Sequence, residues 1–245
     1  MAPPTIVLLH GFTQTGRSWA ETVAALGERY RALAPDLRGH GSAAALRPVS
    51  FAAIGADVLA SADAERAERF TLAGYSMGGR IALDLALRDG GAAQARIDRL
   101  VLIGASPGIA GDGERAARRV ADAALADELE RDGVEAFARR WAAQPLFADQ
   151  PPEVAARAHA ERLRSTPEGL AASLRGVGTG VMEPLWDRLG ELTVPVALIV
   201  GERDAKFRAL AERMAAAIPA ATVHVVAGAG HAVQLEQPVA VAALL

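Results

Sequence analysis

The sequence predicts an α/β protein with a mostly parallel central sheet, helices on both faces of the sheet and an inserted helical cap. Three observations support this fold class. Short apolar runs alternate with segments of helical periodicity, as in βαβ units. The alternation stops once, over residues 107–183. A serine flanked by glycines, in the stretch 74–80, stands where a predicted strand meets a predicted helix.

The strands are predicted from runs rich in Val, Ile and Leu. Most of these runs are continuously apolar, which is typical of parallel strands covered on both faces. In chain order, the predicted strands are 5–11, 30–37, 69–76, 97–106, 194–204 and 221–231.

The helices of the core are predicted from segments with helical spacing between these runs. Glycine ends two of them, at Gly27 and Gly90, as a C-terminal stop signal does. The predicted core helices are 18–27, 51–65, 78–90, 206–218 and 238–245.

The inserted segment, residues 107–183, contains no predicted strand. It is rich in Ala, Arg and Glu, has helical periodicity and is interrupted by Gly- and Pro-containing stretches. We therefore expect three or four helices there, forming a cap. Residues 1–106 and 184–245 would then form one core domain.

Length and composition limit the classes of function. A chain of 245 residues suits one sizeable domain with an insertion. The net charge of −3 argues against binding to nucleic acid or to an anionic membrane through bulk charge. The absence of cysteine excludes disulfides and thiolate metal sites. The N-terminus does not have a signal-peptide pattern and no apolar run reaches about 18 residues, so we expect a cytoplasmic protein.

Ser76 is the candidate nucleophile. The pattern Gly-x-Ser-x-Gly between a strand and a helix is typical of a nucleophile elbow, with Gly74 and Gly78 letting strand and helix approach closely. The alternative is that Ser76 only caps the following helix. A serine needs a base and an orienting carboxylate before it can react. Asp204 and His231 each follow a predicted strand, in the chain order that this arrangement requires.

The other acidic and histidine candidates fit less well. Asp98 stands at the start of its predicted strand and so lies at the wrong end, while His224 falls inside a strand and His159 on a cap helix. Asp204 and His231 could instead be an ordinary turn residue and a buried loop histidine. An oxyanion needs two backbone N–H donors, and these are expected from Met77 and Phe12.

Five motifs resemble the α/β-hydrolase superfamily over nearly the whole chain. They are LLHGFTQTG, PDLRGHG, GYSMGGR, GERD and GAGH, at 8–16, 35–41, 74–80, 201–204 and 228–231. This resemblance implies the α/β-hydrolase fold, but the fold hosts many reactions.

Longer stretches look like one family within that superfamily, the 2-succinyl-6-hydroxy-2,4-cyclohexadiene-1-carboxylate synthases of menaquinone biosynthesis. The matching runs are 141–150, 161–180 and 201–214, of which GERDAKFRAL is the most distinctive. The resemblance implies a lyase that removes a proton next to a ketone and expels pyruvate from a substrate with three carboxylates. It implies no metal and no organic cofactor.

The resemblance also implies residues that bind the substrate. Arginine suits this task because its guanidinium stays charged and pairs with carboxylates. The residues carried over are Tyr75, Arg80, Arg118, Trp141, Arg164 and Lys206. For the arginines the alternative is a solvated helix face, and for Trp141 it is the core of the cap. We expect a monomer or a small homo-oligomer that takes a small polycarboxylate.

Two other functions stay open. A carboxylesterase or carbon–carbon bond hydrolase would use the same three catalytic residues but pass through an acyl or hydrated species. A non-catalytic binding protein of the same fold would ordinarily lack an intact Ser-Asp-His set.

Overall fold

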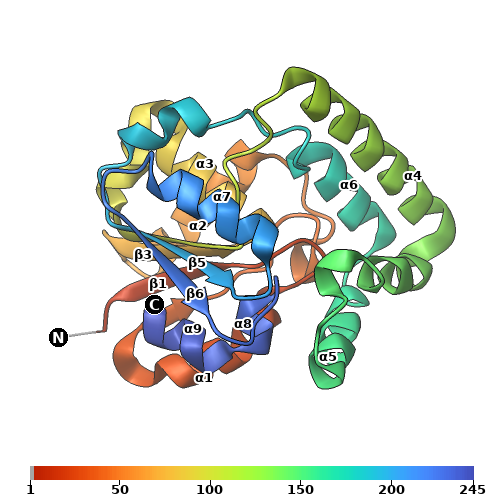
Figure 1. The fold of residues 1–245 in the computed structure, drawn as a ribbon, viewed down its shortest axis with the longest axis horizontal. Helices are drawn as coiled ribbons and strands as arrows, with labels where there is room; N and C mark the ends of the chain where they lie inside the picture. The colour runs from red at the N-terminus through yellow and green to blue at the C-terminus, as the bar shows by residue number, and fades with distance from the viewer. Residues whose placement is uncertain (1–2) are drawn as a thin grey trace.

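A parallel sheet of six strands forms the centre of the molecule, in a computed structural model that describes residues 3–245 (Figure 1). The strand order is β2-β1-β3-β4-β5-β6, and every neighbouring pair is parallel. The strands are β1 (Thr5–Leu9), β2 (Arg31–Leu33), β3 (Phe70–Tyr75), β4 (Ile97–Ile103), β5 (Val196–Gly201) and β6 (Ala221–Val226). The predicted fold class is confirmed.

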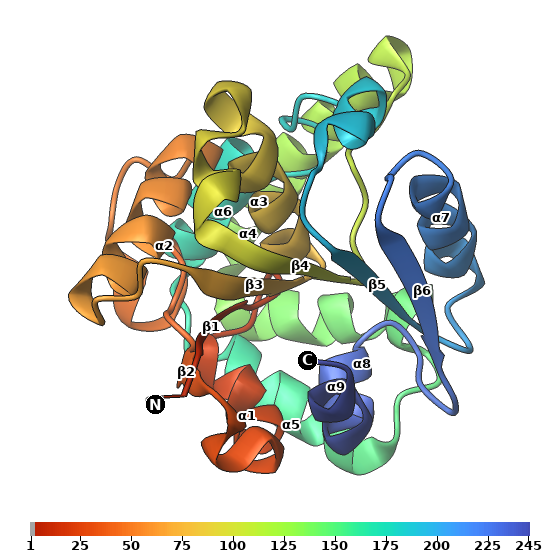
Figure 2. The same cartoon turned by 90° about the vertical axis from the view of Figure 1, so that its left-hand side faces the viewer.

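Helices cover both faces of the sheet, which explains why the strands are so apolar. The core helices are α1 (Ala20–Leu26), α2 (Phe51–Ala64), α3 (Met77–Leu87), α7 (Ala205–Ala215), α8 (Val233–Glu236) and α9 (Pro238–Leu244). Figure 2 shows α1, α8 and α9 on one side of the sheet, with α2 and α3 on the other.

Alternate residues of one strand belong to the two cores that these helices complete. In β1, Val7 and Leu9 belong to the core that includes residues of α2, α3 and α7, whereas Ile6 and Leu8 belong to the core that includes residues of α1, α8 and α9. All five residues of β1 are buried, and so is every residue of β3 and of β5. Burial on both faces removes the polar–apolar alternation from the sequence of these strands.

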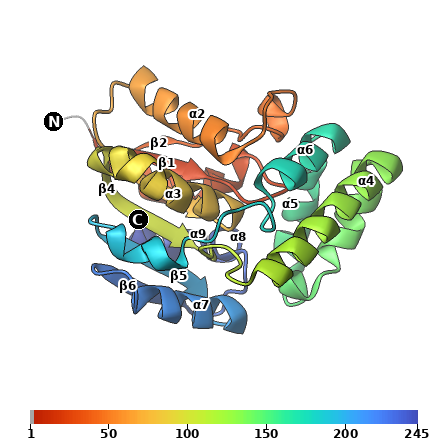
Figure 3. The ribbon, with the colours of Figure 1, turned by 90° about the horizontal axis from the view of Figure 1, so that it is seen from above.

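The chain between β4 and β5 forms a separate group of helices, here called the helical segment (residues 112–177). It comprises α4 (Asp112–Ala142), α5 (Pro152–Arg162) and α6 (Pro167–Val177). Figure 3 shows α4 and α6 side by side beyond one edge of the core layers, and their apolar faces share a cluster around Leu129, Phe137 and Leu170. The limits 107 and 183 assigned to a cap domain stay a prediction.

Some element bounds differ from the predicted ones. The second strand was expected at 30–37 but is only three residues long, since only residues 31–33 pair with β1. The short helix α8 was not predicted, since its four residues are too few to show a helical period. Among the described residues, no helix combines the length and the apolar character needed to cross a lipid bilayer.

Candidate active site

Ser76 stands in the tight turn between β3 and α3. Its backbone has φ 50° and ψ −105°, a conformation that costs energy for any residue with a Cβ. Two hydrogen bonds hold the turn: the Ser76 N–H donates to the carbonyl of Ile103 at 2.8 Å, and the Arg80 N–H donates to the carbonyl of Ser76 at 3.0 Å. The surrounding structure thus fixes a strained serine at the carboxyl end of the sheet.

The glycines around Ser76 are required by close backbone contacts. A Cβ on Gly78 would overlap the carbonyl oxygens of Leu9 and His10 in the neighbouring strand and its loop. A Cβ on Gly74 would overlap the backbone of Gly78 itself. The motif therefore reflects the approach of α3 to β1 and β3, as the elbow interpretation expects.

Asp204 and His231 meet Ser76 at the same end of the sheet. His231 Nδ1 donates to Asp204 Oδ2 at 2.6 Å, and His231 Nε2 lies 3.3 Å from Ser76 Oγ. Because the carboxylate fixes the proton on Nδ1, Nε2 is left as an acceptor for the serine hydroxyl. Ser76 and His231 are 155 positions apart in the sequence, yet their side chains thus belong to one series of hydrogen bonds.

The loops that follow β5 and β6 hold these two side chains. Asp204 caps α7, since its Oδ1 accepts a hydrogen bond from the Phe207 N–H at 3.2 Å while Oδ2 serves His231. The His231 ring packs against the rings of Phe207 and Tyr75, with centroids 4.5 and 5.3 Å apart. Both catalytic candidates are buried, which shields their hydrogen bond from water.

Two backbone N–H groups beside Ser76 have no partner within residues 3–245. Met77 begins α3, so its amide lacks an intrahelical acceptor, and Phe12 lies in the loop after β1. These are the positions from which oxyanion donors were expected. The two loops follow neighbouring strands, because β1 pairs directly with β3.

The histidines of the first loops have structural contacts. His10 Nε2 accepts a hydrogen bond from the Leu37 N–H at 3.0 Å, and its Nδ1 donates to the carbonyl of Gly11 at 2.8 Å. Burial lowers the pKa of His10 to about 4 and that of His40 to about 3. Both rings are therefore neutral at pH 7, and His10 links the loop after β1 to the loop after β2.

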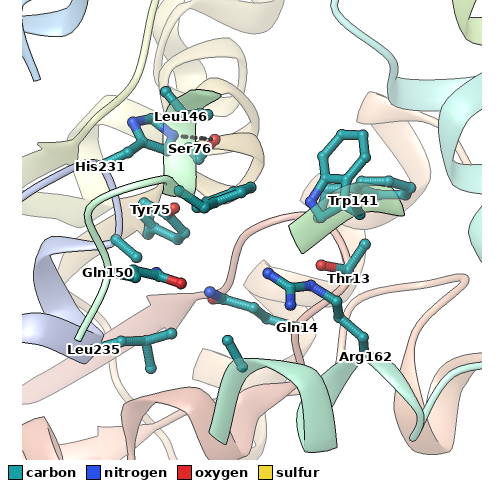
Figure 4. Close-up of a pocket in the computed structure, with 14 residues that line it drawn as sticks. Thr13, Gln14, Tyr75, Ser76, Trp141, Leu146, Gln150, Arg162, His231 and Leu235 are labelled. Carbon is teal, nitrogen blue, oxygen red and sulfur yellow. Dashed lines mark hydrogen bonds between the residues drawn. The ribbon is translucent and has the colours of Figure 1, made fainter. Parts of the chain in front are cut away.

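A cavity opens beside Ser76 (Figure 4). The empty space in it, together with the open solvent at its mouth, amounts to about 440 Å³. Five of the predicted site residues line it: Phe12, Tyr75, Ser76, Trp141 and His231. Asp204 lies behind His231 and lines a neighbouring cavity.

Arg80 does not reach this cavity. Its side chain is buried under α6 and donates from Nη1 to the carbonyl of Val177 at 2.7 Å. Burial, with a smaller contribution from the positive charge of Arg118, lowers the pKa of Arg80 to about 10. In this arrangement Arg80 joins α3 to the C-terminal end of α6.

The remaining predicted cations also lie outside the cavity lining. Arg118 pairs with the buried Asp122 at 2.7 Å, and Arg164 pairs with Glu161 at 2.9 Å, and both arginines are partly exposed on the helical segment. The Lys206 ammonium lies 5.9 Å from the centre of the Phe207 ring. Their assignment to substrate binding stays a prediction.

Comparison with known proteins agrees with this geometry. The model of the family described as "Alpha/beta hydrolase family" matches residues 6–244. The chain belongs to the α/β hydrolase family.

Within the α/β hydrolase family, the chain is similar to proteins named for one activity. The 2-succinyl-6-hydroxy-2,4-cyclohexadiene-1-carboxylate synthase of Salmonella paratyphi B is 33% identical over 97% of this chain and 90% of its own length. A protein of Bacillus subtilis (strain 168), whose name assigns the same activity provisionally, is 37% identical over 97% of this chain and 87% of its own length.

Solved structures give the same grouping within the α/β hydrolase family. MenH from S. aureus superposes with a TM-score of 0.91 at 32% identity, covering 98% of this chain and 91% of that one. The enol-lactonase from Burkholderia xenovorans LB400 has a TM-score of 0.80 at 26% identity, with coverages of 99% and 89%. The expected resemblance to the family of 2-succinyl-6-hydroxy-2,4-cyclohexadiene-1-carboxylate synthases is confirmed.

One guanidinium does line the cavity of this α/β hydrolase, and the sequence did not single it out. Arg162 projects into the cavity from the end of α5, two positions before Arg164. The available signal was its spacing, because Val154, Ala158 and Arg162 are the buried residues of α5 and follow each other every four positions. An arginine that continues an apolar helix stripe is a candidate for a ligand-facing position.

Proposed function

We propose that this α/β hydrolase is a lyase of menaquinone biosynthesis. It would convert 2-succinyl-5-enolpyruvyl-6-hydroxy-3-cyclohexene-1-carboxylate to 2-succinyl-6-hydroxy-2,4-cyclohexadiene-1-carboxylate and pyruvate. The observation that carries the proposal is the series of hydrogen bonds Ser76–His231–Asp204 at the wall of a cavity, in a protein similar to synthases of that name.

The reaction would begin with loss of the proton next to the succinyl ketone. His231, oriented by Asp204, draws the proton from Ser76, and the serine oxygen takes the substrate proton. The electron pair of the broken C–H bond passes into an enolate and then into the ring, where it breaks the bond to the enolpyruvyl oxygen. The proton held by His231 is returned to the departing group, which leaves as pyruvate. No acyl-enzyme is formed.

The enolate oxygen would lie between the Met77 and Phe12 amides. Both N–H groups are unpaired among the described residues, and Met77 starts a helix whose N-terminus is favourable for negative charge. Removal of one donor from such a hole typically lowers the rate by about 10²–10³. This electrostatic stabilisation would be the largest contribution to the rate.

The cavity walls would position the rest of the substrate. Tyr75 and Trp141 line the cavity and are proposed to contact it directly. Arg80, Arg118, Arg164 and Lys206 are proposed as anion binders by resemblance. Since they lie outside the lining as it stands, their contact requires these side chains to rearrange when substrate enters, and for Arg118 and Arg164 it requires a shift of the helical segment. The proposed enzyme is cytoplasmic and needs no metal or organic cofactor.

Product analysis tests the proposal. The purified protein is incubated with the enolpyruvyl substrate, pyruvate is measured with a coupled dehydrogenase and the cyclohexadiene is measured by its ultraviolet absorption. We expect both products in a ratio of one to one. Pyruvate at no more than the rate of the protein-free control would contradict the proposal.

The same serine geometry also suits a carboxylesterase. In that case Ser76 would attack an ester carbonyl and form an acyl-enzyme. A chromogenic short-chain ester separates the two functions. Rapid turnover of the ester, together with no reaction on the enolpyruvyl substrate, would favour the esterase.

A further inference from the structure

The loop after β1 turns sharply at residues 11–14, and this turn carries the Phe12 amide. The Gln14 N–H donates to the carbonyl of Gly11 at 3.1 Å, which closes the turn. Thr13 occupies the third position of the turn with φ 69°, as in a type II turn. A β-branched residue is strained at such a φ, and glycine usually takes this position. The turn therefore needs support from outside its own backbone.

Gln14 supplies part of this support, because it binds both backbone groups of Gly11. Its N–H holds the Gly11 carbonyl, and its side-chain Oε1 accepts a hydrogen bond from the Gly11 N–H at 3.3 Å. The peptide group is planar and trans, so the carbonyl of Gly11 and the N–H of Phe12 point in opposite directions within one rigid unit. Fixing that carbonyl therefore fixes the direction of the Phe12 N–H.

Gln234 in turn fixes the Gln14 side chain. Its Nε2 donates to Gln14 Oε1 at 3.2 Å, so this oxygen receives two donors and the orientation of the amide is set. Gln234 lies on α8, shortly after His231 in the sequence, and it is 1% exposed. The contact therefore links the loop that holds His231 to the turn that holds Phe12.

The hydrogen bond to Gln14 is what distinguishes Gln234 from an apolar residue. Gln234 does not line the cavity of Ser76, whereas Gln14 does (Figure 4). The Oε1 of Gln234 is buried and has no partner in the described part of the chain, residues 3–245. A half-satisfied buried amide costs stability that an apolar side chain of similar length would avoid. Its donor to Gln14 is the one feature that such a side chain could not supply.

We propose that Gln234 is a positioning residue for the reaction at Ser76. Through Gln14, it holds the turn of residues 11–14 so that the Phe12 N–H points to the oxyanion. The inference rests on the proposed function in one respect, which is that the Phe12 amide stabilises the enolate oxygen. The base and this oxyanion donor are then kept at a fixed separation by the hydrogen bond between Gln234 and Gln14.

The opposing explanation is that Gln234 only fills space beneath the loop. Gln234→Met separates the two explanations, since methionine has a similar length but cannot donate a hydrogen bond. If Gln234 fills space, kcat is unchanged and any effect is on the melting temperature. If Gln234 positions the turn, kcat falls while KM stays the same, because the lost interaction acts in the transition state.

Gln94→Met is the matched control. Gln94 is also a buried glutamine, but its partners are Thr193 and the carbonyl of Glu191, which do not line the cavity of Ser76. We expect Gln94→Met to lower the melting temperature and to leave kcat unchanged. The two variants thus show opposite patterns if only Gln234 positions the turn.

Initial rates of pyruvate release are measured for the wild type, Gln234→Met, Gln14→Met and the double variant. We expect Gln234→Met to lower kcat by about 10- to 100-fold, the effect of misplacing a group at the site by about 1 Å. The double variant should lose no more than Gln14→Met alone, because Gln234 acts through Gln14. Unchanged kcat in Gln234→Met, or losses that multiply in the double variant, would overturn the proposal.

Amide hydrogen exchange, followed by NMR, tests the positioning without turnover. Gln14 Oε1 protects the Gly11 N–H, so its exchange should become about 2- to 10-fold faster in Gln234→Met, the factor that one ordinary hydrogen bond gives. In Gln94→Met the Gly11 exchange should match that of the wild type. Equal Gly11 exchange in Gln234→Met and the wild type would also overturn the proposal.

These results are separable from the proposed function. A protein that releases no pyruvate, but in which Gln234→Met speeds the exchange of Gly11, would retain the positioning residue and lose the lyase assignment. A protein that releases pyruvate with the same kcat in the wild type and in Gln234→Met would retain the lyase assignment and lose the positioning residue.

Discussion

The backbone at Ser76 is held in a conformation that its own side chain disfavours. The φ of 50° is fixed by hydrogen bonds to Ile103 and Arg80 and by the close packing of Gly74 and Gly78. Strain of this kind persists where the fold over-determines a position, and here it presents Oγ to His231. One residue is thus positioned by the whole turn.

The Asp204 carboxylate should matter through orientation. Asp204→Asn keeps the shape of the side chain, but the amide can donate to Nδ1 and so favours the tautomer with the proton on Nε2. We expect kcat for pyruvate release to fall by about 10⁴, the effect of this change in a serine hydrolase. Steady-state kinetics measures it, with circular dichroism as the control for folding. An unchanged kcat would show that Asp204 does not orient His231.

The buried histidines predict acid sensitivity. The folded-state pKa values of about 4 for His10 and about 3 for His40 lie below the unfolded value of 6.5. The unfolded chain therefore binds more protons as pH falls through 6.5, so stability is lost over this range. Each histidine should lower the free energy of unfolding by about 2 kcal/mol between pH 7 and pH 5.

Urea unfolding at a series of pH values checks this loss. In a His40→Gln variant the contribution of His40 is gone, so the decrease between pH 7 and pH 5 should be smaller than that of the wild type by about 2 kcal/mol. The comparison uses the change in the free energy of unfolding with pH. This change is not affected by a loss of stability that the substitution causes equally at every pH. An equal decrease in both proteins would contradict the assignment.

At the scale of elements, α4 is divided by Gly133. This residue has φ 81° and ψ 166°, a region open essentially to glycine alone, and the kink directs the second half of α4 so that Phe137 and Trp141 stack near Phe12. Trp141 then lines the cavity. The shape of one helix therefore forms part of the site wall.

Gly133→Ala isolates this backbone effect. A Cβ at Gly133 would meet no atom within 4 Å, so any cost comes from the dihedral angles alone. We expect the free energy of unfolding to fall by about 1–3 kcal/mol, measured by urea denaturation. Gly113→Ala is the matched control, because that site is equally open and has no positive φ. Equal stability of the two variants would contradict the argument.

The strands and helices of the core were largely predictable from the sequence. For the helical segment, the sequence predicted that helices would form but not which of their faces would be buried. Apolar runs located β1, β3, β4, β5 and β6; β1, β3 and β5 are buried along their whole length, whereas most of β6 is partly exposed. Arg157 and Arg162 of α5 and Arg164 just after it lie in a stretch of similar composition, and only packing decides which of them is buried. The rotation of α5 about its own axis depends on contacts with the rest of the protein. One is the hydrogen bond from Arg157 Nη2 to the carbonyl of Leu235 at 3.1 Å, which joins α5 to α8.

For the molecule as a whole, the sheet order explains where the site lies. From β1 the chain goes to β2 on one side and then to β3 on the other, so the loops after β1 and β3 diverge and leave a crevice at their carboxyl ends. Ser76, Phe12, Asp204 and His231 all follow strands at this edge. The motifs predicted this convergence, since parallel strands end together. The packing of the helical segment over the crevice could not be predicted from sequence patterns, because no strand fixes the position of that segment.

The central claim is that Ser76, activated by His231, removes a proton from a pyruvate-releasing substrate in this crevice. The most direct measurement is the initial rate of pyruvate release by the wild type and by Ser76→Ala at saturating enolpyruvyl substrate. We predict turnover by the wild type and a fall in kcat of about 10²–10⁴ in the variant, the contribution of general-base catalysis. Turnover by Ser76→Ala at the rate of the wild type would contradict the claim.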